Sequence, residues 1–104
     1  MIDLKQLQKD IYKNKLDKVF NVTDINKEFC LTYGEMSEAY EAWRKKQTDV
    51  GEEIADVVIY LLGLSEILNI DLESELLKKV NKNKHRQYKM INGVNTRIKE
   101  YNEE

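Results

Sequence analysis

The sequence contains no proline and only four glycines, so few positions interrupt a helix. It has one cysteine, Cys30, which excludes an internal disulfide and fits a reducing, cytoplasmic setting. The longest apolar run covers residues 57–64, well short of the roughly 20 residues that span a bilayer. These absences favour a soluble, helical protein and argue against a secreted or membrane-spanning one.

Charge is distributed unevenly along the 104 residues, although the formal net charge is only -2. Residues 1–27 carry a net charge of +2, residues 28–77 carry -9, and residues 78–104 carry +5. A hydrophobic content of 41% is sufficient for a core, and the length is that of one domain. The acidic middle and the basic end are therefore the first candidates for a functional site.

The spacing of apolar residues predicts four helices. They cover residues 3–13, residues 24–46, about twenty residues from 49 onward, and residues 71–89, with residues 14–22 as a connection. Thr23 or Asp24 is expected to cap the second helix and Asp49 the third. Residues 90–104, which include Asn92 and Gly93, are expected to form a short helix or a tail.

The third helix is apolar on nearly every face between Ile54 and Leu68. Such a helix needs partners all round, and three sibling helices in a small monomer would not cover it. We therefore predict one all-α domain over residues 1–104, a four-helix bundle completed by homodimerisation, with residues 28–88 as its core motif region. Whether dimers pair further into tetramers is left open.

Two pairs of acidic residues stand out because they lack basic neighbours. Glu35 and Glu38 lie three residues apart on the second helix, and Glu53 and Asp56 have the same spacing on the third. No Lys or Arg stands three or four positions from any of the four, so like charges on one helix face remain uncompensated. A short connection between antiparallel helices would bring the two pairs face to face.

Four converging carboxylates call for a hard divalent cation, and oxygen ligands favour Mg²⁺, or alternatively Mn²⁺. The simpler interpretation is a solvated acidic face, but the missing basic neighbours favour the metal site. A di-iron carboxylate bundle is a poorer alternative, because it needs two Glu-x-x-His motifs and the sequence has a single histidine, His85.

The basic C-terminal segment, residues 78–104, carries side chains that can bind an anion. Lys79, Asn83 and Arg86 share one face of the fourth helix at positions i, i+4 and i+7. Lysine, asparagine and arginine side chains can all donate hydrogen bonds to phosphate oxygens. Together with a carboxylate metal site, this face suggests a phosphorylated, metal-chelating substrate.

At these residues the sequence resembles the MazG-like nucleoside triphosphate pyrophosphohydrolases, the all-α group that includes dCTP pyrophosphatase and the dimeric dUTPases. The matching features are the E-x-x-E helix at 35–38, the E-x-x-D helix at 53–56 with the I-Y-L segment at 59–61, and the Lys79, Asn83 and Arg86 face. Gly34 departs from the many members that begin the first motif with two adjacent glutamates.

The resemblance implies that water cleaves a (deoxy)nucleoside triphosphate between its α- and β-phosphates, which yields a monophosphate and pyrophosphate. It implies a nucleotide as the partner rather than nucleic acid or a membrane. The implied metal ligands are Glu35, Glu38, Glu53 and Asp56, the implied phosphate contacts are Tyr60, Lys79, Asn83 and Arg86, and the candidate catalytic bases are Glu38 and Glu41.

Two questions stay open at this point. The nucleobase is unassigned, because Tyr33, Tyr40 and Trp43 either stack on a base or pack in the core, and helical spacing favours the core. The alternative function is a catalytically silent helical dimer that binds a protein or a nucleic acid through residues 78–99.

Overall fold

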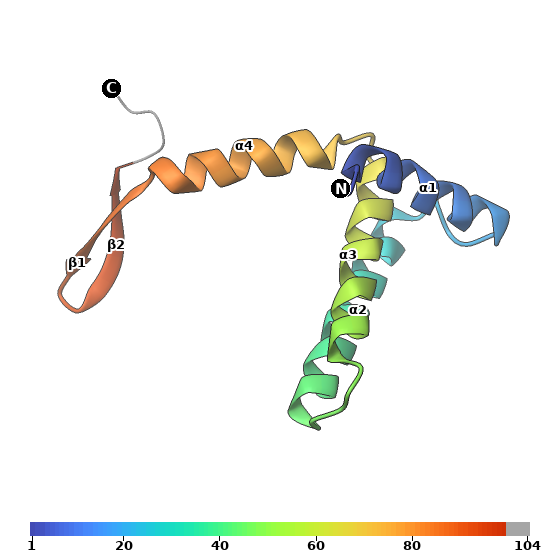
Figure 1. Ribbon diagram of the computed structural model, residues 1–104, viewed down its shortest axis with the longest axis horizontal. Helices are drawn as coiled ribbons and strands as arrows, with labels where there is room; N and C mark the ends of the chain where they lie inside the picture. The colour runs from blue at the N-terminus through green and yellow to red at the C-terminus, as the bar shows by residue number, and fades with distance from the viewer. Residues whose placement is uncertain (100–104) are drawn as a thin grey trace. The chain divides into compact units, whose positions relative to one another are not determined.

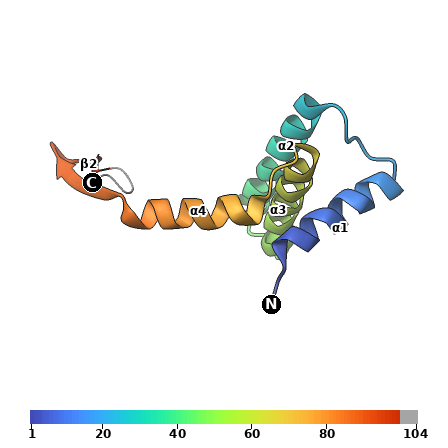
Figure 2. The same ribbon diagram turned by 90° about the horizontal axis from the view of Figure 1, so that it is seen from above.

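The computed structural model describes residues 1–99, which belong to two compact units, Met1–Leu72 and the segment that begins at Glu73. Figures 1 and 2 show the elements of each unit. The first unit contains α1 (Leu4–Asp17), α2 (Ile25–Arg44) and α3 (Val50–Ile67). The helix α4 (Leu72–His85) and the strands β1 (Gln87–Ile91) and β2 (Val94–Lys99) follow.

In the first unit, α2 and α3 form an antiparallel pair, and α1 packs against α3 (Figures 1 and 2). The turn between α2 and α3 is short, as predicted, because Lys46 adopts a left-handed conformation and Gln47 N–H donates to the Ala42 carbonyl at 2.9 Å. The buried apolar side chains of this unit are Ala39, Ala42, Val57, Leu62 and Leu64. This pairing brings the two acidic motifs onto facing helices.

Of the two predicted caps, the one on α2 is confirmed and the one on α3 is not. Asp24 caps α2 by accepting from Lys27 N–H at 3.0 Å, and Asp3 caps α1 in the same way from Gln6 N–H. Asp49 precedes α3 as predicted, but its side chain makes no capping hydrogen bond. The first helix also extends to Asp17, so half of the predicted connection is helical.

Gly63 and Gln8 fix α1 on α3. A Cβ atom on Gly63 would lie 3.3 Å from Lys15 Cδ and 3.4 Å from Ile11 Cγ2, so glycine permits the close approach of the two helices. The buried Gln8 amide donates to Glu66 Oε1 at 2.9 Å and to the Ile70 carbonyl at 2.6 Å. These contacts determine where Lys15 lies relative to α3.

The prediction of an all-α chain is wrong at its C-terminal end. The fourth helix ends at His85 instead of Lys89, and residues 87–99 form an antiparallel hairpin in place of a short helix or tail. Asn92 and Gly93 both have positive φ, 51° and 78°, which is the two-residue turn that suits a hairpin. The last part of that prediction, residues 100–104, lies outside the described residues.

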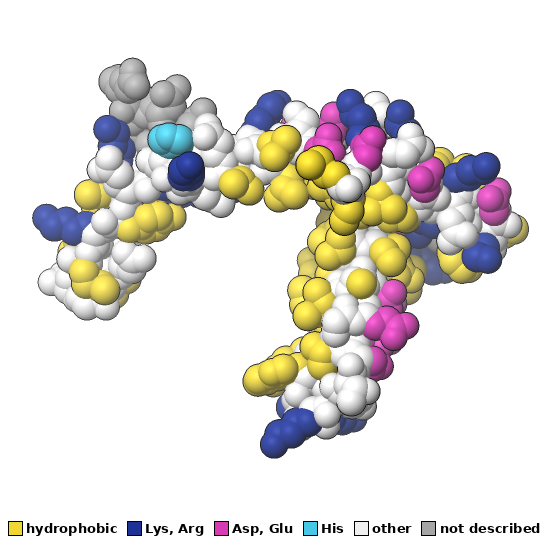
Figure 3. Space-filling view, viewed as in Figure 1, with side chains coloured by type: hydrophobic (Ala, Val, Ile, Leu, Met, Phe, Trp, Pro, Cys, Tyr) yellow, Lys and Arg dark blue, Asp and Glu magenta, His cyan; other side chains and the backbone are white. Residues whose placement is uncertain are grey.

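The aromatic residues of α2 do not pack in the core of this chain. Tyr33, Tyr40 and Trp43 are 72%, 56% and 65% exposed, so the favoured expectation of core packing is wrong for the single chain. On α3, Ile54, Val58 and Leu61 are also exposed. Figure 3 shows hydrophobic side chains along one edge of the α2–α3 pair and acidic side chains along the other.

Candidate metal and nucleotide site

Three of the predicted ligands come together between α2 and α3. Glu35, Glu38 and Glu53 each offer one carboxylate oxygen, and these oxygens lie within 4.8 Å of one another. Glu38 is exposed, whereas the other two are half-buried. The antiparallel helix pair therefore produces the convergence that the spacing of the two motifs predicted.

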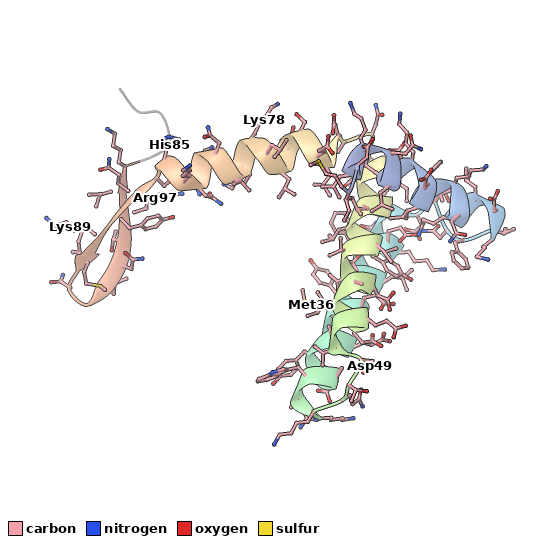
Figure 4. The ribbon with its side chains drawn as sticks, in the orientation of Figure 1. Met36, Asp49, Lys78, His85, Lys89 and Arg97 are labelled. Carbon is pink, nitrogen blue, oxygen red and sulfur yellow. The ribbon has the colours of Figure 1, made fainter. Side chains whose placement is uncertain are left out.

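Asp56 is half-buried beside this group without belonging to the set of three. Its negative charge is one of the causes that raise the pKa of both Glu35 and Glu53. It thus lies close enough to contribute to the same electrostatic field. Figure 4 labels Asp49 at the start of α3, the end of the helix that carries Glu53 and Asp56.

The local environment disfavours the charged forms of Glu35 and Glu53. Desolvation, followed by the charge of Glu38 and a hydrogen bond with it, raises the pKa of Glu35 above its usual value of 4.5. Desolvation and then the charge of Asp49 raise the pKa of Glu53. Within residues 1–99, none of the four predicted ligands forms a salt bridge.

Two oxygen atoms at the site are buried without a hydrogen-bond donor among the described residues. They are Oε2 of Glu53 and Oδ1 of Asp49. An acceptor that loses its hydration without gaining a donor lowers the stability of the folded state. A divalent cation held by carboxylate oxygens would remove both this cost and the mutual repulsion, so the donor set fits Mg²⁺ or Mn²⁺.

Glu41, the second candidate base, has a different environment. Its carboxylate accepts hydrogen bonds from the Arg44 side chain at 3.2 and 2.8 Å, and Lys45 Nζ lies 3.7 Å away. The hydrogen bond with Arg44 is the main cause that lowers the pKa of Glu41. A lowered pKa makes Glu41 a weaker proton acceptor than a glutamate without a cationic partner.

Tyr60 lies one turn after Asp56, as predicted, and is half-buried. Desolvation raises the pKa of its hydroxyl, and the charge of Glu35 is the next cause. Lys15 Nζ lies 5.3 Å from the centroid of the Tyr60 ring. The Tyr60 ring thus lies near the Lys15 cation of α1, and the charge of Glu35 acts on its hydroxyl.

The basic residues lie in the second unit. Arg86 donates a hydrogen bond to Asn83 Oδ1 at 3.0 Å, so these two side chains share a face at the end of α4, and Lys79 lies one turn before Asn83. That they contact phosphate oxygens stays a prediction. Figure 4 labels Lys78 and His85, which lie on the same helix.

Sequence analysis did not identify the pair formed by Lys15 and Glu28. Lys15 Nζ and Glu28 Oε1 are 2.8 Å apart, and the side chains are only 11% and 1% exposed. The available signal was that Glu28 lies two turns before Glu35 on the same face of α2. Lys15 was missed because its segment was assigned to a connection.

Comparison with known proteins supplies one match. A sequence model of the MazG-like family matches residues 18–103, which include both acidic motifs, α4 and the hairpin. The chain belongs to the MazG-like family. Neither the curated proteins nor the solved structures include a match.

Membership of the MazG-like family suggests a function of the nucleotide pyrophosphatase type, and it supports a helical fold. No helix within residues 1–99 is long and apolar enough to cross a membrane.

Proposed function

We propose that this MazG-like protein is a Mg²⁺-dependent hydrolase that cleaves nucleoside triphosphates between the α- and β-phosphates. The observation that supports it best is the group of three carboxylate oxygens within 4.8 Å of one another, with no salt bridge among the described residues. The buried, unpaired Oε2 of Glu53 supports a metal rather than a solvated acidic surface.

Glu35, Glu38, Glu53 and Asp56 would hold the cation. When bound, it would neutralise charge that develops on phosphate oxygens and lower the pKa of the attacking water. Mn²⁺ is the alternative cation, since it accepts the same oxygen ligands.

The chain's own residues would orient the triphosphate and accept a proton. Water attacks one of the phosphorus atoms that flank the α–β bridging oxygen, and the bond from that phosphorus to the bridging oxygen breaks. Glu38 and Glu41 are both candidates to accept the proton of the water, since Glu41 pairs with Arg44 and Glu38 would itself hold the cation. Tyr60, Lys79, Asn83 and Arg86 would donate hydrogen bonds to phosphate oxygens.

We also propose that the active form is a homodimer. The exposed apolar side chains of α2 and α3 lie at steps of three and four, which places them in one stripe along each helix. On α2 these are Phe29, Tyr33, Met36, Tyr40 and Trp43, and on α3 they are Ile54, Val58 and Leu61. Large contiguous apolar surfaces on soluble proteins mark interfaces, and a second copy would bury this one.

The direct test is hydrolysis of a panel of nucleoside triphosphates in Mg²⁺, with release of pyrophosphate and monophosphate measured together. We expect turnover with at least one nucleotide, and a loss on the order of 100-fold or more in Glu53→Ala and in Asp56→Ala. Asp17→Asn, which removes an exposed carboxylate of α1, is the matched control and is expected to retain activity.

Two outcomes would contradict the proposal. One is the absence of turnover with every nucleotide tested, which would favour a catalytically silent helical dimer. The other is turnover that survives both substitutions in the acidic motifs.

A further inference from the structure

The ion pair between Lys15 and Glu28 is buried, which is unfavourable for the free energy of folding. Both side chains are almost fully buried, and burial of two charges costs desolvation energy that their attraction only partly returns. Apolar residues of similar volume would serve a purely structural role as well or better.

One of the two carboxylate oxygens of Glu28 accepts no hydrogen bond from the described residues. Its Oε1 binds Lys15 Nζ and also accepts from Asn21 Nδ2 at 3.3 Å. Its Oε2 is buried and has no donor among the described residues. Because buried acceptors are nearly always paired, this oxygen has the character of a recognition group that awaits a donor.

Two cavities of about 320 and 300 Å³ adjoin this pair. They share Lys15, Phe20 and Tyr60 as lining residues, and Glu28 lines the second cavity. Phe20, which lines both cavities, supplies a flat apolar surface on which a nucleobase can stack. The cavities therefore combine a stacking surface with a buried carboxylate.

Some of the residues that line these cavities lie on the same two helices as the carboxylates, α2 and α3. Tyr60 lies one turn beyond Asp56 on α3, and Glu28 lies two turns before Glu35 on α2. After desolvation, the charges of Glu35, Glu28 and Asp56 are among the causes that raise the pKa of Tyr60, which lines both cavities. Two turns of helix span about 11 Å, and we take a nucleotide with its phosphates at the carboxylates to extend its base along the helices toward these cavities.

We infer that Glu28 selects triphosphates whose base carries an exocyclic amino group. A carboxylate only accepts hydrogen bonds, so it pairs with the amino group of cytosine, adenine or guanine. Uracil and thymine carry a carbonyl oxygen where cytosine has its amino group, and hypoxanthine carries one where adenine has its amino group. The carboxylate repels this oxygen. The inference rests on the proposed function, because it names which substrates that site accepts.

The test compares kcat/KM within two matched pairs, dCTP with dUTP and dATP with dITP, in Mg²⁺. Each pair differs at the position of the amino group, where one member carries a carbonyl oxygen. In the pair that the protein hydrolyses faster, we expect the amino member to be preferred on the order of 10- to 100-fold, because the wrong base leaves a buried polar group unpaired.

The variant Glu28→Gln keeps the shape of the side chain and adds an N–H donor. We expect it to reduce the preference to about one or to reverse it, since an amide can donate to a carbonyl oxygen. Asp17→Asn, on α1 but outside both cavities, is expected to keep the wild-type ratio.

A second variant guards against misfolding, since Glu28→Gln leaves Lys15 buried without its partner. Lys15→Met combined with Glu28→Leu replaces both charges by apolar side chains, which is often neutral or stabilising. This double variant is expected to fold, as judged by circular dichroism, and to lose the preference.

The outcomes separate this inference from the proposed function. Turnover without a preference for the amino member, or an unchanged ratio in both variants, would overturn the role of Glu28 and leave the hydrolase intact. An absence of turnover with every triphosphate would overturn the hydrolase and, with it, the selection of its base.

Discussion

Glu35 and Glu53 show how far the surroundings of a side chain decide its chemistry. Both are glutamates on helix surfaces, yet desolvation and neighbouring carboxylates raise the pKa of each above 4.5. Glu41 lies only six residues from Glu35, and Arg44 lowers its pKa. The difference comes from the partners that the fold supplies, and it leads to a prediction about pH.

Without added metal, Glu35 and Glu53 are expected to destabilise the protein as pH rises above about 4.5. Because their folded pKa values are raised, the folded state binds more protons than the unfolded state in this range, so the free energy of unfolding falls with increasing pH. Glu41 acts in the opposite sense, because its stabilising contribution is lost as pH falls through its lowered pKa.

The measurement is the melting temperature across pH 4 to 8, with and without Mg²⁺. We expect the difference between Glu53→Gln and the wild type to favour the variant increasingly as pH rises, and Mg²⁺ to stabilise the wild type most at the upper end. A difference that does not change with pH would contradict the raised pKa of Glu53.

Asp56→Asn tests the metal site at a single residue. The substitution removes one charge from the cluster and keeps the side-chain volume, so we expect loss of Mg²⁺ binding by calorimetry without unfolding. The melting temperature without metal is expected to stay level or rise, because like-charge repulsion decreases.

The matched control is Glu52→Gln, an exposed carboxylate on the same helix whose charge also acts on Glu53. It is expected to reduce Mg²⁺ affinity only slightly, since it changes the field without removing a ligand. Equal losses in the two variants would assign the effect to charge alone.

At the scale of elements, the helix pair and the hairpin differ in how directly the sequence predicted them. The α2–α3 pair followed from an amphipathic segment, a nearly all-apolar segment and the short connection between them, and it was confirmed. The hairpin was missed because residues 90–104, with Asn92 and Gly93 among them, were predicted to form a short helix or a tail. Their dipeptide, between segments of alternating apolar residues, was the available signal.

The C-terminus of α1 contains strain that a substitution should relieve. Val19 follows the helix with φ of 58°, a left-handed conformation that is costly for a β-branched residue, and its side chain is 90% exposed. Glycine adopts this conformation freely, so Val19→Gly is expected to stabilise the protein by about 1 kcal/mol.

That gain corresponds to a rise of roughly 4–8 °C in melting temperature for a domain of this size. Val19→Ala keeps a Cβ atom and therefore most of the strain, which makes it the control. Equal melting temperatures for the two variants would show that the backbone conformation at this position costs little.

At the scale of the whole molecule, the exposed apolar surface of α2 and α3 is the feature that association would change most. If a second copy covers it, the melting temperature should rise with protein concentration, because association adds a concentration-dependent term to the free energy of unfolding. Val58→Glu, which places a charge in the middle of that surface, is expected to yield monomers by sedimentation and to lower the melting temperature.

Leu16→Glu is the matched control, since Leu16 on α1 is similarly exposed, 48% against 46%, but lies outside the surface. It should leave the oligomeric state unchanged. A wild-type melting temperature that is independent of concentration over a hundredfold range would contradict the dimer.

The sequence by itself determined the helical segments of the first unit and the identity of the acidic motifs. Both depend on local spacing, since residues three or four apart share a helix face wherever the helix is placed. It also showed that Glu35, Glu38, Glu53 and Asp56 lack basic neighbours along their own helices.

Only the tertiary structure decided which residues from different helices meet. The Lys15 and Glu28 pair joins side chains thirteen positions apart on two helices, and no periodicity within either helix specifies that contact. The exposure of Tyr33 and Trp43 was also a tertiary result, because helical spacing shows that side chains share a face but not what covers it. Packing supplies that information, since burial depends on neighbours that are distant in the chain.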